Sequence, residues 1–202
     1  DYLGQAQAQD GAYLWWRAVL PAAESAVLLF CPLPAREART EAAWRVLAQL
    51  YEGPFYRRLR TELQLGYAVF SGFRQLGEQA GLLFAVQSPK ASAAEILGHI
   101  EGFLAERTGE LAALSECRLA QECASLGTRL GDPAAGLRSL AEQAWQAQLA
   151  GCGADYPRRV RAALQTLPLH ELRRQQQALL EARGGWRVLA NAAPPDPRWQ
   201  AL

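Results

Sequence analysis

The chain has 202 residues, a formal net charge of +1 and hydrophobic residues at half of its positions. These proportions are typical of a globular protein and exclude collagen-like, low-complexity and strongly disordered chains. The balanced charge gives no basic surface for nucleic acid, and no apolar run reaches the roughly 18–20 residues needed to span a bilayer. We therefore expect no nucleic acid and no membrane among the partners.

The first predicted elements are two strands. Residues 13–20 (YLWWRAVL) are rich in aromatic and branched side chains, which favour extended structure. Residues 26–31 (AVLLFC) form a continuous apolar run of strand length, which predicts a strand that is buried on both faces. Because proline cannot donate to a sheet ladder, Pro32 and Pro34 should end the second strand.

Helical spacing of apolar residues then predicts a long amphipathic helix over residues 40–63. The Gly-Pro pair at 53–54 should kink or restart this helix, because proline lacks the amide hydrogen that the helix needs. Residues 66–73 and 81–88 are predicted to be strands. Since the segment 75–78 (QLGE) between them supplies a turn, the two strands should form a hairpin.

The second half of the chain is predicted to be helical nearly throughout residues 92–181, in about five helices. A last short strand is predicted over 186–190, and residues 194–202 form a proline-rich tail. Asp132 and Pro133 resemble an N-cap followed by proline at the first helical position. Breaks between the helices are expected near 108–109, 131–133, 151–155 and 167–168.

The order of these elements indicates an α+β fold. Hairpins followed by a helical block are typical of an antiparallel sheet with helices segregated to one face. We expect a two-layer domain with a mainly antiparallel sheet of five to six strands covered by helices.

The cysteines carry no sign of a zinc site or a disulfide scaffold. They form no C-x-x-C pair, and no histidine follows them at zinc-finger spacing. Free, mostly buried thiols are expected, which favours a reducing compartment and a cytoplasmic location, with the periplasm as the alternative. The cysteines are Cys31, Cys117, Cys123 and Cys152.

The chain has no methionine, not even at position 1, so we expect it to be a piece of a longer protein.

The two histidines do not complete a catalytic zinc motif. A peptidase zinc site needs two histidines one helical turn apart, with a glutamate beside one of them. After His99 the pattern H-x-x-E-H fails at Gly102, and after His170 the pattern H-E-x-x-H fails at Arg174. The nucleophile elbow and the glycine-rich phosphate loops are also absent from the sequence. We expect both histidines to lie on helix surfaces and this chain to hold no metal.

The segment 55–88 carries a motif with specific residue types and spacing. It reads Leu-Arg-Thr at 59–61, Gln-Leu-Gly-Tyr at 64–67 and Gln-Ser at 87–88. This phrase resembles the signature of the C-terminal half of insulinase/pitrilysin-type zinc metallopeptidases, the inverzincins. In that family a helix ends in such a phrase and runs straight into a strand. Beyond these residues, the order of elements matches one repeat unit of the family.

The resemblance implies a single inactive peptidase unit over residues 1–193, with a LuxS/processing-peptidase-like metallohydrolase fold. Such proteins carry four related units, and only the first holds zinc through H-x-x-E-H, which is absent here. Zinc is therefore expected in a missing N-terminal catalytic half, which would be a partner together with a peptide substrate. By the same resemblance, Tyr67 donates a hydrogen bond to the developing oxyanion and Arg60 holds a peptide carbonyl, while Gly66 permits the sharp junction.

Two alternatives stay open from the residues themselves. Tyr67 could be a strand residue that caps the core, with Arg60 as a solvated charge near the helix C-terminus, where the helix dipole favours cations. The domain as a whole could be a non-catalytic scaffold or interaction domain of the processing-peptidase or core-protein type.

Overall fold

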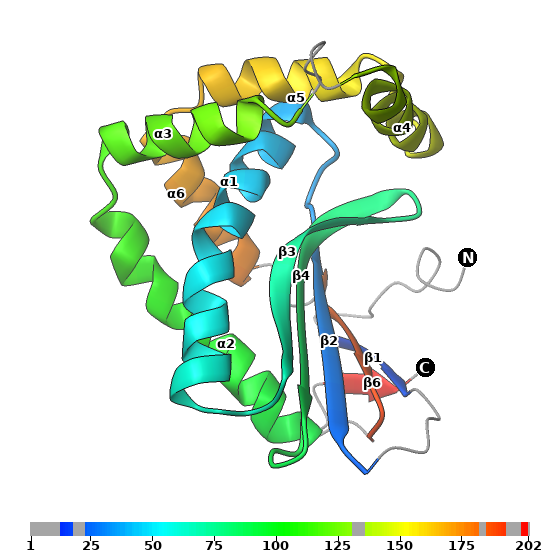
Figure 1. The fold of residues 1–202 in the computed structure, drawn as a ribbon, viewed down its shortest axis with the longest axis vertical. Coiled ribbons are helices and arrows are strands. Elements are labelled where there is room, and N and C mark those ends of the chain that lie inside the picture. The colour runs from blue at the N-terminus through cyan, green and yellow to red at the C-terminus, as the bar shows by residue number, and fades with distance from the viewer. Residues whose placement is uncertain (1–12, 18–22, 131–135, 182–184, 193–198, 202) are drawn as a thin grey trace.

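The computed structural model describes residues 13–17, 23–130, 136–181, 185–192 and 199–201 (Figure 1). A six-stranded sheet has the order β3-β4-β2-β5-β1-β6. The neighbours from β3 to β5 pair antiparallel, whereas β1 pairs parallel with both β5 and β6. The strands are β1 (Tyr13–Arg17), β2 (Ser25–Pro32), β3 (Ala68–Leu76), β4 (Gln79–Ser88), β5 (Arg187–Ala190) and β6 (Trp199–Ala201).

Helices pack on one face of this sheet, which confirms the predicted α+β fold (Figure 1). None of the described helices combines the length and the apolar composition needed to cross a membrane. The helices are α1 (Ala38–Tyr56), which continues as a π-helix (Arg57–Glu62), α2 (Ala93–Ala112), α3 (Glu116–Gly127), α4 (Gly136–Leu149), α5 (Tyr156–Gln165) and α6 (Leu169–Glu181).

The predicted hairpin is confirmed, because β3 and β4 pair antiparallel from Ala68↔Gln87 to Leu76↔Gln79. The turn between them is tight, and Gly77 occupies it with a φ of 60°. A two-residue hairpin loop needs such a left-handed residue, and glycine adopts it without steric cost. The predicted turn over 75–78 is narrower in the structure, because Gln75 and Leu76 still pair within β3 and only residues 77–78 form the loop.

The predicted break near 108–109 is wrong, and the predicted interruption at 53–54 does not restart the helix. α1 runs through the Gly-Pro pair at 53–54, and α2 runs through 108–109 to end at Ala112. Buried residues on both sides of each site favour the continuous helix, because apolar packing outweighs the roughly 1 kcal/mol that a helical glycine costs and the roughly 3 kcal/mol that Pro54 costs inside α1. These flanking residues are Tyr51 and Phe55 in α1, and Phe103, Leu104 and Leu111 in α2. Ser115 instead marks the break after α2, since its side chain accepts a hydrogen bond from the Arg118 amide and caps α3.

The ends of the chain differ from the prediction in detail. The described part of the first strand ends at Arg17, and residues 18–20 lie outside the described residues. The Asp132-Pro133 cap and residues 194–198 of the expected tail also lie outside them. Within that tail, Trp199–Ala201 forms strand β6, which pairs with β1 at the edge of the sheet.

The core lies between the sheet and α1. Phe55 of α1 packs edge-on against Phe84 of β4 and Phe103 of α2, with both ring centroids 5.2 Å from its own. Farther along α1, the buried Trp44 indole donates a hydrogen bond of 3.1 Å to the Gln175 amide oxygen of α6. These contacts fix α1 against the sheet and against the neighbouring helices. They therefore also fix the place where α1 ends and the chain turns back into β3.

Candidate functional site

The end of α1 departs from regular helical geometry. Residues Arg57–Glu62 form a π-helix, and the Leu63 amide donates to the Arg58 carbonyl at 3.0 Å. The Leu65 amide then donates to the Leu59 carbonyl at 3.0 Å, while the Leu59 side chain is fully buried. π-helical turns occur frequently at functional sites, where they re-aim side chains. Here the wide turn lies in the segment that the sequence motif occupies.

The chain passes from this turn into β3 through a tightly constrained junction. Gln64 has a φ of 49°, in the left-handed region that non-glycine residues rarely adopt. At Gly66, an added Cβ would lie 1.8 Å from the Gln87 carbonyl oxygen of β4. Only glycine allows the two backbones to approach so closely. The predicted role of Gly66 at a sharp junction therefore has a physical cause in this structure.

A buried serine ties the junction to the end of β4. The Ser88 hydroxyl donates to the Leu65 carbonyl and accepts hydrogen bonds from the amides of Lys90 and Ala91, at 3.1 and 3.0 Å. Ser88 is only 1 % exposed, so these bonds form away from bulk water. Ser88 of the motif thus ties the backbone just before β3 to the backbone that follows β4.

Arg60 and Tyr67 line the same open hollow, of about 580 Å³, beside this junction. We call it the junction hollow. Arg60 is half-buried, and in the part of the chain that the structure describes it makes no hydrogen bond or ion pair. The structure thus brings together the two residues that the sequence singled out, seven positions apart. The residues lining the hollow are Tyr56, Arg60, Thr61, Gln64, Leu65, Gly66, Tyr67, Pro89 and Lys90.

Tyr67 does not cap the core. It precedes β3 and is 61 % exposed. Its hydroxyl oxygen accepts a hydrogen bond of 2.9 Å from the Gln87 amide, which also donates to the Glu24 carboxylate at 2.8 Å. Hydrogen bonding to Glu24 is the main cause that raises the pKa of Tyr67, so the phenol stays protonated at neutral pH and can donate a hydrogen bond.

Sequence reasoning missed two residues of this arrangement. Gln87 belongs to the motif but has no role assigned from the sequence, and Glu24 carries no signal of its own in the sequence. The strand register explains why these residues meet. Gln87 pairs with both Ala26 in β2 and Ala68 in β3. That register brings Glu24 and Tyr67, each just before its strand, to the same end of the sheet.

An apolar hollow of about 260 Å³ adjoins the site on the sheet face opposite the helices. Phe70 and Leu189 remain 47 % and 41 % exposed there, and Gln87 contributes to the wall. In the described part of the chain no helix covers this face (Figure 1). Gln87 therefore links the two hollows: it lines the apolar one and donates a hydrogen bond to Tyr67, which lines the junction hollow.

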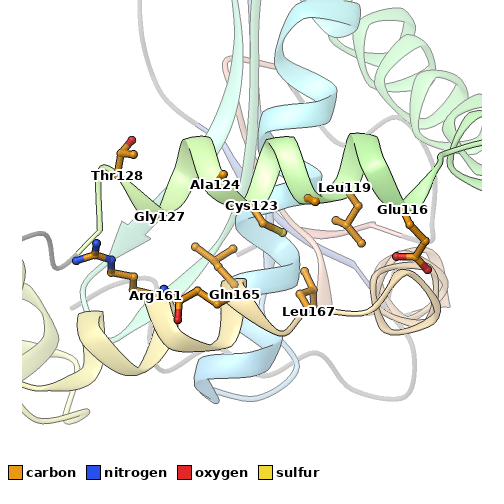
Figure 2. Close-up of a pocket in the computed structure, with 11 residues that line it drawn as sticks. Glu116, Leu119, Cys123, Ala124, Gly127, Thr128, Arg161, Gln165 and Leu167 are labelled. Carbon is orange, nitrogen blue, oxygen red and sulfur yellow. The ribbon is translucent and has the colours of Figure 1, made fainter.

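A third hollow lies between α3 and α5, and we call it the α3–α5 groove. It measures about 410 Å³, and Figure 2 shows Glu116 and Arg161 near its opposite ends, with Cys123 and Leu119 between them. Burial raises the pKa of Cys123 to about 11, so its sulfur is a neutral thiol and a poor nucleophile. A neutral thiol of this kind gives the groove no activated nucleophile.

The histidines lie apart from the junction hollow. His99 is half-buried on α2 and His170 is exposed on α6. Among the described residues, no three His, Cys, Asp or Glu side chains are grouped so that they could hold a metal ion. The site in this chain therefore offers hydrogen-bond donors and a cation to a ligand.

Comparison with known proteins places these features in a family. The model of the family described as "PQQ synthase PqqF-like, C-terminal lobe domain 4" matches residues 46–145. A protein named coenzyme PQQ synthesis protein F from Pseudomonas aeruginosa is 49% identical over 168 residues, which are 83% of this chain. Its counterpart from Pseudomonas putida is 43% identical over 92% of this chain. The chain spans only 22% and 23% of the length of these relatives.

Solved structures share the fold. Pitrilysin superposes with a TM-score of 0.78 at 20% identity, over 98% of this chain and 22% of that chain. The inactive domain of an M16 peptidase from Pseudomonas fluorescens superposes with a TM-score of 0.62 at 14% identity, over 92% of this chain and 44% of that one. These structures share the fold, and the family model and the relatives confirm the resemblance seen in the sequence motif. Among members, the divergent ends and composition of the sequence favour the peptidase of pyrroloquinoline quinone (PQQ) biosynthesis, and the family model and the relatives confirm this too.

Proposed function

The chain belongs to the insulinase/pitrilysin-type peptidase family, as a PqqF-like domain of the C-terminal lobe, and from this premise we propose a role in peptide cleavage. The domain closes the substrate chamber of a zinc metalloendopeptidase and holds no metal itself. The zinc ion belongs to the N-terminal catalytic half of the full-length protein. Arg60 and Tyr67 reach from this domain to the peptide bond that is cleaved.

The observation that supports this proposal is the meeting of Arg60 and Tyr67 in one open hollow. The chain between them contains the end of the π-helix, the left-handed Gln64 and the close approach at Gly66. Backbone strain of this kind clusters at functional sites, because it persists only where the surrounding structure enforces it. A solvated helix-end arginine and a core-capping tyrosine would need none of these features.

The two side chains suit different parts of the reaction. A neutral phenol is a hydrogen-bond donor, and a donor aimed at a developing oxyanion stabilises the transition state more than the ground state. A guanidinium holds a carbonyl oxygen through charge-assisted hydrogen bonds, which form with the ground state as well. Tyr67 therefore acts mainly on the rate, and Arg60 on both binding and rate.

The substrate that we propose is the peptide precursor of PQQ. This choice rests on the similarity to proteins named for PQQ synthesis, at 43–49% identity over most of this chain. A location in the cytoplasm belongs to the same proposal, with the periplasm as the alternative.

Steady-state kinetics of the full-length peptidase test the proposal. Tyr67→Phe should lower kcat on the order of 10²-fold, about 2.7 kcal/mol, with little change in KM, because one oxyanion donor is lost. Arg60→Ala should raise KM and lower kcat together, and Arg60→Lys should restore part of the loss. Circular dichroism checks that each variant is folded. A kcat within about twofold of the wild type for Tyr67→Phe would favour the scaffold alternative instead.

A further inference from the structure

The Tyr67 hydroxyl is connected to two side chains that come from other parts of the sheet. Gln87 lies near the end of β4, and Glu24 lies just before β2. The Gln87 Nε2 atom is 2.9 Å from the Tyr67 Oη atom and 2.8 Å from a carboxylate oxygen of Glu24. A phenol that is 61 % exposed needs no such support for packing.

Simple donor and acceptor chemistry fixes the direction of these bonds. A carboxylate carries no hydrogen and only accepts, so the Gln87 atom that faces Glu24 must be the amide nitrogen. That nitrogen has two hydrogens, and the second one points to the Tyr67 oxygen. The phenol oxygen is therefore an acceptor from Gln87, while its own hydrogen is directed to the Glu24 carboxylate, the hydrogen bond that raises the pKa of Tyr67.

The strand register makes this arrangement rigid. Gln87 pairs with Ala26 in β2 and with Ala68 in β3, and Ala68 is the residue next to Tyr67. The Gln87 carbonyl is also the backbone group that approaches Gly66 so closely. Both the main chain and the side chain of Gln87 thus determine where Tyr67 stands.

We propose that Gln87 and Glu24 are positioning residues for Tyr67. Gln87 holds the phenol oxygen, and Glu24 orients both the Gln87 amide and the phenol hydrogen until the carbonyl oxygen of a bound peptide replaces Glu24 as the acceptor. This inference rests on the proposed function of Tyr67. Neither residue contacts the peptide itself; each acts through the tyrosine.

Two basic residues, Arg60 and Lys90, line the same hollow as Tyr67. Their positive charges favour the ionised phenol, whereas the Glu24 carboxylate opposes ionisation and raises the pKa of Tyr67. Glu24 is thus the group whose removal should shift the phenol titration. Replacing it by glutamine keeps the shape and removes the charge.

A double-mutant cycle in the full-length peptidase tests the proposal. Gln87→Leu should lower kcat about fivefold with KM nearly unchanged, because one neutral hydrogen bond to the phenol is lost. In a Tyr67→Phe background, Gln87→Leu should have no further effect on kcat. The matched control is Gln177→Leu on α6, which breaks an exposed Gln–Glu hydrogen bond of the same kind and should leave kcat unchanged.

An equal loss from Gln87→Leu in both backgrounds would overturn the positioning role, since a structural effect does not depend on the hydroxyl. If Tyr67→Phe itself leaves kcat unchanged, the proposed function fails instead.

A second readout does not depend on activity. The ionisation of Tyr67, measured as the difference in 295 nm absorbance between the full-length protein and its Tyr67→Phe variant, should occur at lower pH in Glu24→Gln. An unchanged titration would overturn the role of Glu24.

Discussion

The junction hollow and the α3–α5 groove are both hollows on the surface of one domain, but their walls are built differently. The groove lies between two regular helices, and its sulfur is a protonated thiol. The junction hollow forms where a helix widens into a π-turn, a non-glycine residue is left-handed and two backbones nearly touch. Helices leave grooves between them wherever they pack. A strained junction must be enforced by its surroundings, and here it holds an arginine and a tyrosine in one place.

The largest difference in stability between the two regions should come from their glycines. Gly66→Ala places a Cβ 1.8 Å from the Gln87 carbonyl oxygen, so one backbone must move. We expect a loss of about 3 kcal/mol, at the upper end for an overpacked site. Gly127→Ala, in the wall of the groove, meets no atom within 4 Å and should be neutral or stabilising by up to about 1 kcal/mol. Urea unfolding followed by circular dichroism measures both.

Similar midpoints for the two alanine variants would contradict this comparison. They would mean that the close approach at Gly66 relaxes without cost.

A smaller difference in stability is expected when a hydroxyl group is removed from each of the two regions. Ser88→Ala leaves the Leu65 carbonyl and two amides at the junction without their buried partner, which should cost about 1–3 kcal/mol. Thr128→Ala, in the groove wall, removes an exposed bond to the Ser125 carbonyl and should cost less than about 0.5 kcal/mol. Thermal unfolding of the two variants gives the comparison. A loss for Thr128→Ala as large as for Ser88→Ala would show that the junction is no more constrained than the groove.

The thiol in the groove leads to a prediction about how stability and cysteine reactivity depend on pH. Burial raises the pKa of Cys123 from about 9 to about 11, so the folded state binds a proton that the unfolded state has released between these values. The stabilising contribution is complete below pH 9 and is lost as the pH rises towards 11. Alkylation of Cys123, followed by mass spectrometry of the folded chain, should therefore accelerate only at this alkaline end. Rapid alkylation of Cys123 near pH 8 would show that the groove exposes a reactive thiolate.

The sequence predicted the parts of the fold that depend on local patterns. The hairpin followed from alternating apolar residues around Gly77, and the order of strands and helices followed from the change in periodicity. The helices continue through 53–54 and 108–109 despite glycine and proline, because burial on either side of these sites is a tertiary effect that local propensity does not contain. Strand β6 was missed because three residues beside a proline-rich stretch give little strand signal.

The candidate site was predicted only in part. The motif singled out Arg60 and Tyr67, and the structure places them together. The contacts of Tyr67 with Gln87 and Glu24 depend on the register of β2, β3 and β4, which no local pattern reveals. Residues that are far apart in sequence and act through a neighbour are thus the ones that sequence reasoning misses.

The central claim is that the junction hollow contacts the peptide in the full-length enzyme. Photo-crosslinking tests it most directly, with p-benzoylphenylalanine in place of Tyr67 in a full-length protein whose zinc-binding half has been inactivated. Trp145 on α4 provides a matched control position, since its exposure of 62 % equals that of Tyr67 at 61 %. We predict that the precursor peptide crosslinks to position 67 and not to position 145 of the full-length protein. Equal crosslinking at both positions, or crosslinking at neither, would contradict it.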